Sequence, residues 1–158
     1  MAGELLLSEG FREDLIRIIA NTPELEQTPM LRLLPAVDGI SIVKFISKNQ
    51  LVGGAAYDVG YILGQKGVAF KILAILPESR KQGYGTAALN LIEKHFVEKY
   101  NAVLVNGIPL DENAMSWFSK RGYSKVEDEP WTFIVKSLQP DILPQNKIGE
   151  LVAYFKSH

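Results

Sequence analysis

The chain has 158 residues, of which 47% are apolar and 22% charged, with a formal net charge of −1 and no cysteine. This length and composition predict one domain with an ordinary soluble core. The absence of a basic stripe argues against nucleic acid or a membrane surface as a partner. Without cysteine, disulfides, thiolate nucleophiles and cysteine-ligated zinc are all excluded.

The two histidines, His95 and His158, stand far apart in the sequence and form no His-x3-His pair, so we expect no metal site. His95 falls on a predicted helix and is expected to be structural or exposed. The N-terminus carries Glu4 and only three consecutive leucines, which predicts a mature protein rather than a signal peptide. No apolar run approaches the ~20 residues of a membrane span. A cytoplasmic location is the expectation.

A strand followed by short helices is predicted for the first part of the chain. Residues 4–7 can form the strand, and Ser8 can then cap a helix. Thr22-Pro23 and Thr28-Pro29 each resemble an N-cap followed by proline at the first helical position, which predicts one or two short helices within 22–34. Helical spacing of apolar residues marks the inner face of the first helix: Phe11, Leu15, Ile18 and Ile19.

Three strands are predicted next, as an antiparallel meander. Residues 40–47 alternate and are rich in β-branched side chains, and residues 51–63 and 68–76 continue this character. Asn49-Gln50 and the stretch 64–67 are the predicted turns between them.

Helices and strands alternate in the rest of the chain, which implies a mixed sheet with helices on its faces. Asp111 can cap the second of these helices and Gly122 can end it. The predicted elements are a helix over 86–100, a strand over 102–106, a helix over 111–121, strands over 123–127 and 131–138, a linker over 140–144 and an amphipathic helix over 145–156.

The stretch from Phe70 to Phe96, FKILAILPESRKQGYGTAALNLIEKHF, carries the chemistry. A strand runs into Pro77, a charged turn follows, and the glycine-rich residues 82–86 open a helix. Glycine lets the backbone approach a ligand, and the first N–H groups of a helix favour a phosphate. Arg80 and Lys81 add positive charge beside them. These residue types predict a diphosphate site.

Other interpretations of these glycines stay open. Residues 83–88 also fit the loose dinucleotide pattern G-x-G-x-x-A, but that pattern normally follows the first strand of a domain, with an acidic residue ending the next strand. Here the next strand ends in Asn106. A G-x4-G-K-[S/T] phosphate loop is absent. A glycine-rich turn without a ligand is the third interpretation.

The segment 75–89, I-L-P-E-S-R-K-Q-G-Y-G-T-A-A-L, resembles the acetyl-CoA motif of the GNAT superfamily, where an apolar strand and a proline precede Arg/Gln-x-x-Gly-x-Gly/Ala. A second stretch, Asn113-Ala114 followed by Trp117-Phe118 and Gly122-Tyr123, is similar to the family's N-A-x-x-aromatic…G-F signature. The resemblance covers about residues 4–138. It implies an α+β GNAT fold, with a mixed, mostly antiparallel sheet flanked by helices. Residues 139–158 then form an extra linker and helix, packed on the domain or on a partner subunit.

The resemblance also implies an N-acetyltransferase that passes an acetyl group directly from acetyl-CoA to a primary amine of a small molecule or peptide. The loop amides would hold the pyrophosphate, the strand before the loop would pair with the pantetheine arm, and Asn113 would contact the pantetheine or the departing CoA. The implied cofactor-binding residues are Leu73, Ala74, Ile75, Arg80, Lys81, Gln82, Gly83, Tyr84, Gly85, Thr86, Asn113 and Phe118.

The chain differs from many family members at the positions of the general acid and the general base. Many relatives carry a tyrosine acid where this chain has Phe118, and a glutamate base on the central strand where residues 70–73 contain no carboxylate. An amine near pKa ~10.4 must lose a proton before it attacks. The catalytic residues are therefore open. The side chains considered as substitutes are Asp58, Asp111 and Tyr123, with Tyr57, Tyr61 and a water chain beside them.

The acceptor and the partners are less defined. The acidic loop 127–129 suits a positively charged acceptor such as a polyamine, an aminoglycoside or a lysine-rich peptide, or is simply a solvated turn. Trp131 either lines the acceptor pocket or anchors the last strand. We expect a monomer or homodimer with no nucleic acid and no metal. The alternatives are a CoA-binding regulatory module that has lost catalysis, and an interaction domain without CoA.

Overall fold

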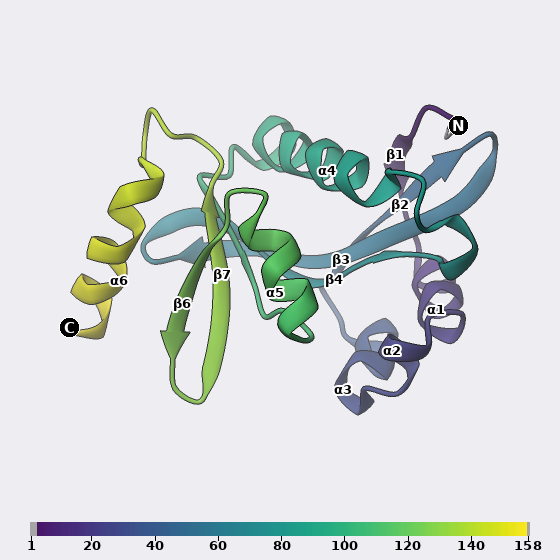
Figure 1. The fold of residues 1–158 in the computed structure, drawn as a ribbon, viewed down its shortest axis with the longest axis horizontal. Helices are drawn as coiled ribbons and strands as arrows, with labels where there is room; N and C mark the ends of the chain where they lie inside the picture. The colour runs from purple at the N-terminus through teal and green to yellow at the C-terminus, as the bar shows by residue number, and fades with distance from the viewer. Residues whose placement is uncertain (1–2, 158) are drawn as a thin grey trace. The chain divides into compact units, whose positions relative to one another are not determined.

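The computed structural model describes residues 3–157, so His158 and the first two residues lie outside it (Figure 1). It contains a seven-stranded sheet with the strand order β1-β2-β3-β4-β5-β7-β6. The predicted α+β arrangement, a mostly antiparallel mixed sheet with flanking helices and a C-terminal helix, is confirmed. The chain divides into two compact units, Met1–Asp58 with Lys71–Lys94 and Val59–Phe70 with His95–His158, and both β3 and β4 contribute to each unit.

The first unit pairs β1 (Leu6–Glu9), β2 (Ser41–Ser47) and β3 (Gln50–Ile62) as antiparallel neighbours. Between β1 and β2 the chain forms α1 (Arg12–Ala20), α2 (Pro23–Glu26), α3 (Pro29–Arg32) and a 3₁₀ turn, Leu34–Ala36. The predicted prolines stand at the first helical positions of α2 and α3. Apolar residues of these helices and of the strands share one core: Leu15, Ile18, Ile19, Leu25, Leu34, Ala56, Ile72, Ala74 and Leu76.

The predicted cap at Ser8 is wrong. Ser8 lies in β1 opposite Lys44, and the pairing continues as Gly10 N–H donates to the Ile42 carbonyl over 2.9 Å. The longer strand moves the start of α1 to Arg12. Asp14 secures that start, because its Oδ2 accepts from the Phe11 N–H over 2.8 Å. Strand pairing with β2 therefore overrode a local capping preference.

Both predicted hairpin turns lie slightly earlier in the chain than expected. Lys48 and Asn49 have φ of 53° and 62°, and Leu63 and Gly64 have φ of 52° and 75°. Two successive positive φ angles are typical of the two-residue type I′ turn, whose twist matches that of the flanking strands. β3 and β4 (Gln65–Ile75) consequently begin directly after these pairs.

The second unit holds the parallel part of the sheet. β5 (Leu104–Gly107) pairs in parallel with Gly67–Phe70 of β4 and antiparallel with β7 (Trp131–Ser137), which in turn pairs with β6 (Ser124–Asp128). α4 (Tyr84–Tyr100) runs through both units, and α5 (Glu112–Ser119) lies in the second. Asp111 caps α5 as predicted, with its Oδ1 accepting from the Ala114 N–H over 2.8 Å.

The C-terminal helix α6 (Ile148–Lys156) packs on the second unit, beyond the β6–β7 hairpin (Figure 1). Ile148 is buried in a cluster with Val103, Leu104 and Val135. Gln145 fastens the segment before the helix, since its Oε1 accepts from the Ser137 N–H over 2.7 Å and its Nε2 donates to the Val135 carbonyl over 3.0 Å. No helix in the described residues is long and apolar enough to cross a membrane.

Candidate functional site

The loop between β4 and α4 presents backbone N–H groups to an anion. Lys81 and Gly83 have φ of 64° and 81°, separated by Gln82 with negative φ, an alternation typical of anion-binding nests. The Gly83 carbonyl accepts from the Ala87 N–H over 3.3 Å, so Gly83 is the N-cap of α4. The following amides, at Tyr84 and Gly85, precede the first intrahelical donor and lie at the positive end of the helix dipole. This geometry suits a phosphate.

Gly83 is required for its backbone angle rather than for space. A Cβ built on it would meet nothing within 4 Å, and its φ of 81° is one that side-chain-bearing residues rarely adopt. Lys81, Gln82, Gly83 and Thr86 are all exposed. A ligand can therefore approach the loop from solvent.

The side chain of Tyr84 anchors the start of α4 to β2. Its side chain is 7% exposed, and its hydroxyl donates to the Oγ of Ser47, at the end of β2, over 3.1 Å. Tyr84 therefore presents its backbone rather than its side chain to the loop. No local pattern pointed to Ser47, because the partner of a buried hydroxyl lies far away along the chain.

One edge of β4 is turned away from β3. Leu76 N–H donates to the Val52 carbonyl of β3 over 2.8 Å. In a trans peptide the preceding carbonyl, that of Ile75, points the opposite way. Strand geometry repeats every second residue, so the N–H and C=O of Leu73 face the same edge. Of the expected pantetheine-pairing residues, Leu73 and Ile75 thus present main-chain groups on this edge, whereas the Ala74 carbonyl faces Gly53 of β3. β5 pairs only with the earlier residues 67–70.

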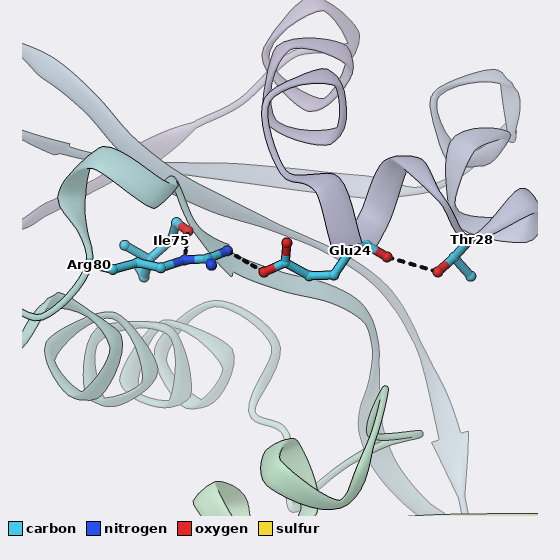
Figure 2. A network of polar contacts seen from close by, with 4 residues as sticks. All are labelled: Glu24, Thr28, Ile75 and Arg80. Atoms are coloured by element: carbon cyan, nitrogen blue, oxygen red, sulfur yellow. Dashed lines mark hydrogen bonds and ion pairs between the residues drawn. The ribbon is translucent and has the colours of Figure 1, made fainter.

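The Arg80 side chain, although partly exposed, contacts β4 and α2. Its Nε donates to the Ile75 carbonyl over 3.0 Å, and its Nη2 lies 2.6 Å from the Oε1 of Glu24 on α2 (Figure 2). The carbonyl of Glu24 in turn accepts from the Thr28 hydroxyl over 2.9 Å (Figure 2). Sequence reasoning assigned Arg80 to the pyrophosphate and missed Glu24, since no local pattern links a carboxylate on α2 to this loop.

The predicted residues of α5 lie in the second unit. Asn113 is exposed, and within the part of the chain that the structure describes its side chain makes no hydrogen bond. Phe118 packs edge-on against Trp117 and Tyr123, with ring centroids 4.9 and 5.1 Å apart. Tyr123 is 4% exposed, so its ring is part of the core around Phe118.

Three of the side chains considered as substitutes for the general base each have a structural role. Asp58 lies 3.5 Å from the ammonium of Lys71 in an exposed ion pair. Asp111 accepts the capping hydrogen bond of α5, and Tyr123 is buried. In residues 3–157 no group of three or more His, Asp or Glu side chains could hold a metal ion.

The acidic turn between β6 and β7 is partly compensated by lysines. Lys125 lies 3.3 Å from a carboxylate oxygen of Glu127, and Lys156 of α6 donates to the Glu127 carbonyl over 2.6 Å. Asp128 and Glu129 are exposed, and Trp131 is 53% exposed. The turn thus combines negative charge with an accessible indole.

His95 lies among aromatic rings of α4, with Phe96 and Tyr100 at centroid distances of 6.4 and 6.1 Å. Its Nε2 is buried and has no hydrogen-bond partner among the described residues. Burial lowers the pKa of His95 below 6.5, the Lys99 ammonium lowers this pKa further, and Glu98 opposes the shift. His95 is therefore a neutral structural residue near neutral pH.

A family model described as Acetyltransferase (GNAT) family matches residues 11–123 of the chain. This span contains the β4–α4 loop, α5 and both sequence motifs. None of the curated protein sequences matches the chain.

Solved structures agree in fold at low sequence identity. An acetyltransferase from Thermus thermophilus is 18% identical, covers 87% of this chain and 99% of its own, and has a TM-score of 0.65. A spermidine N-acetyltransferase mutant from Vibrio cholerae is 13% identical, with 87% and 96% coverage and a TM-score of 0.65. The PaiA N-acetyltransferase of Thermoplasma acidophilum, solved with coenzyme A, is 14% identical, with 85% and 99% coverage and a TM-score of 0.61.

Proposed function

The chain belongs to the acetyltransferase (GNAT) family, and we propose that it transfers an acetyl group from acetyl-CoA to a primary amine of a small molecule or peptide. The observation that carries the proposal is the left-handed Gly83 at the N-terminus of α4, one short loop after a β4 edge with outward main-chain groups. A strand edge followed along the chain by an amide cradle suits a diphosphate joined to an amide-containing arm.

The cofactor is assigned to backbone groups of the first unit. The amides at residues 83–86 receive the pyrophosphate, with the Lys81 ammonium as the nearby formal charge. The main chain of Leu73, and the N–H of Ile75, pair with the amides of the pantetheine arm. An outward N–H of this edge also polarises the thioester carbonyl and stabilises the oxyanion. Contacts of Asn113 and Phe118 with CoA remain predictions of the sequence motif.

The reaction is a direct acyl transfer. The nitrogen lone pair of a neutral amine adds to the thioester carbon, the C–S bond breaks, and the acetyl amide forms. The amine nitrogen loses one proton and the departing sulfur gains one. A thiol has a pKa of only ~8.5, so its thiolate is a tolerable leaving group even though Phe118 cannot supply a proton.

Removal of the amine proton is assigned to water. Asp58 and Asp111 already hold an ion pair and a helix cap, and residues 70–73 contain no carboxylate. A water base implies that the rate rises with pH as the fraction of neutral amine increases, because the free amine has a pKa near ~10.4.

An amine panel tests the activity. Polyamines, aminoglycosides and lysine-rich peptides are incubated with acetyl-CoA, and the released CoA thiol is measured. The protein contains no cysteine, so it adds no thiol background. Turnover that depends on the amine supports the proposal. Acceptance of these polycationic amines but not of a simple alkyl monoamine would favour a role for the acidic turn at 127–129.

A second candidate is a CoA-binding regulatory module without catalysis. The observation that favours it is the engagement of Asp58, Asp111 and Tyr123 in structural contacts. Acetyl-CoA binding without CoA release across the panel would support this candidate over the enzyme.

A further inference from the structure

We propose that Glu24 and Arg80 are a pair of positioning residues for the cofactor strand, and that Arg80 does not bind the diphosphate. The inference rests on the proposed function, since it concerns the same acetyl-CoA site. It changes the role of the arginine from a charge offered to the ligand to a tether between β4 and α2. It also adds Glu24 to the residues that determine cofactor affinity.

Two nitrogens of the Arg80 guanidinium are already engaged within the protein. Its Nε holds the Ile75 carbonyl over 3.0 Å, on the outward edge of β4, and its Nη2 holds Glu24 over 2.6 Å (Figure 2). A guanidinium donates through a rigid planar fork, so two contacts in different directions fix its orientation. The Ile75 carbonyl at the end of the edge is thereby occupied. The neighbouring groups of Leu73 and the N–H of Ile75 are left to the pantetheine arm.

The other end of the tether is equally fixed. Leu25, next to Glu24, is 7% exposed and belongs to the core of the first unit. Pro23 starts α2, and the Thr28 hydroxyl donates to the Glu24 carbonyl over 2.9 Å. α2 is therefore anchored on both sides of Glu24, and the carboxylate meets Arg80 from a preset position.

Charge argues against a second role for Arg80 at the phosphates. The Glu24 carboxylate neutralises the guanidinium, and moving Arg80 to the ligand would break this ion pair and place the carboxylate near a second anion. Both side chains stay about two-fifths exposed, at 41% and 43%, so solvent screens the pair and the expected effects are moderate. Lys81 is the uncommitted cation, because it is exposed and has no ion pair among the described residues.

S-acetylpantetheine lacks the diphosphate, so its affinity distinguishes a positioning role of Arg80 from a direct contact with the diphosphate. Affinities for acetyl-CoA and for S-acetylpantetheine are measured for the wild type and for Glu24→Gln, Arg80→Gln, Arg80→Lys and the double Gln variant. Lys81→Gln is the control for a direct phosphate contact, and Glu26→Gln is the matched control on α2. Melting temperatures are recorded for every variant.

Positioning predicts that Glu24→Gln, Arg80→Gln and Arg80→Lys each weaken both ligands about three- to tenfold. It also predicts that the double variant is no weaker than either single one, since the two residues act as a unit. Lys81→Gln should weaken acetyl-CoA alone, and Glu26→Gln should change neither. Arg80→Lys is the most informative variant, because it keeps the positive charge and removes the planar guanidinium that makes the two directed contacts.

Three results would overturn the assignment while leaving the proposed function intact. They are a loss confined to acetyl-CoA in Arg80→Gln, full affinity in Arg80→Lys, and tighter acetyl-CoA binding in Glu24→Gln. Lower melting temperatures with unchanged affinities would mean that the pair only stabilises the fold, and would overturn the assignment as well. A wild type that binds neither ligand would instead refute the proposed function, and this assignment with it.

Discussion

Gly83 provides the sharpest test of the loop, because the chain contains a second glycine in nearly the same state. Gly83 and Gly39 have φ of 81° and 80°, and a Cβ on either would meet nothing within 4 Å. Replacing each by alanine therefore adds the same backbone strain and no clash. Only Gly83 lies in the proposed pyrophosphate loop.

The strain sets the magnitude. A non-glycine residue in the left-handed region costs about 1–2 kcal/mol. For a chain of this size, each kcal/mol lowers the melting temperature by roughly 2–4 °C. Gly83→Ala and Gly39→Ala should consequently lose similar stability. Gly83→Ala should also weaken acetyl-CoA at least tenfold, because relief of the strain turns the loop amides away from the phosphates.

The assay combines thermal unfolding with calorimetric titration of acetyl-CoA for both variants. We expect matched melting shifts and an affinity loss in Gly83→Ala alone. Equal affinity in the two variants, with equal loss of stability, would refute the assignment of the pyrophosphate to this loop.

Three further changes test the structure around the site. His95 is neutral in the fold, while an unfolded histidine binds a proton below about pH 6.5, so the free energy of unfolding should fall as the pH drops through that value. In His95→Phe, urea midpoints measured from pH 5 to 8 should lose this dependence on pH. An unchanged dependence would mean that another group causes it. Gly53→Ala places a Cβ against the Ala74 carbonyl oxygen of β4 and should destabilise by about 1–3 kcal/mol in a melt, whereas Gly60→Ala, in open space, should not. Tyr84→Phe removes the hydroxyl that donates to the buried Ser47 hydroxyl, and should lower the free energy of unfolding by about 1–2 kcal/mol. Removing the Ser47 hydroxyl as well should restore part of that loss in denaturant unfolding. If it does not, the hydrogen bond is not the cause of the loss.

Local signals predicted most of the fold. The prolines that open α2 and α3, the Asp111 cap and the order of strands and helices follow from short patterns that do not depend on distant partners. The errors came where pairing decided the outcome. Ser8 was drawn into β1 by β2, and the twist of each hairpin, rather than glycine content alone, placed its turn at the two positive-φ residues.

In the candidate site, too, the sequence predicts features that depend on neighbouring residues and not those that depend on distant partners. The glycine-rich start of α4 was visible in the sequence, because a phosphate cradle is made of consecutive amides. The partner of Arg80 was not visible, since Glu24 meets it only through the packing of α2 on the core. Counting side-chain charge along the chain therefore leaves out the carboxylate that lies beside Arg80.

Binding of acetyl-CoA at the β4–α4 loop underlies every step of the proposed function, and calorimetric titration of the purified protein with acetyl-CoA is its decisive test, with NAD as the control ligand. We expect micromolar binding of acetyl-CoA and none of NAD. A protein that does not bind acetyl-CoA, or that binds NAD in its place, would refute the proposed role of the loop.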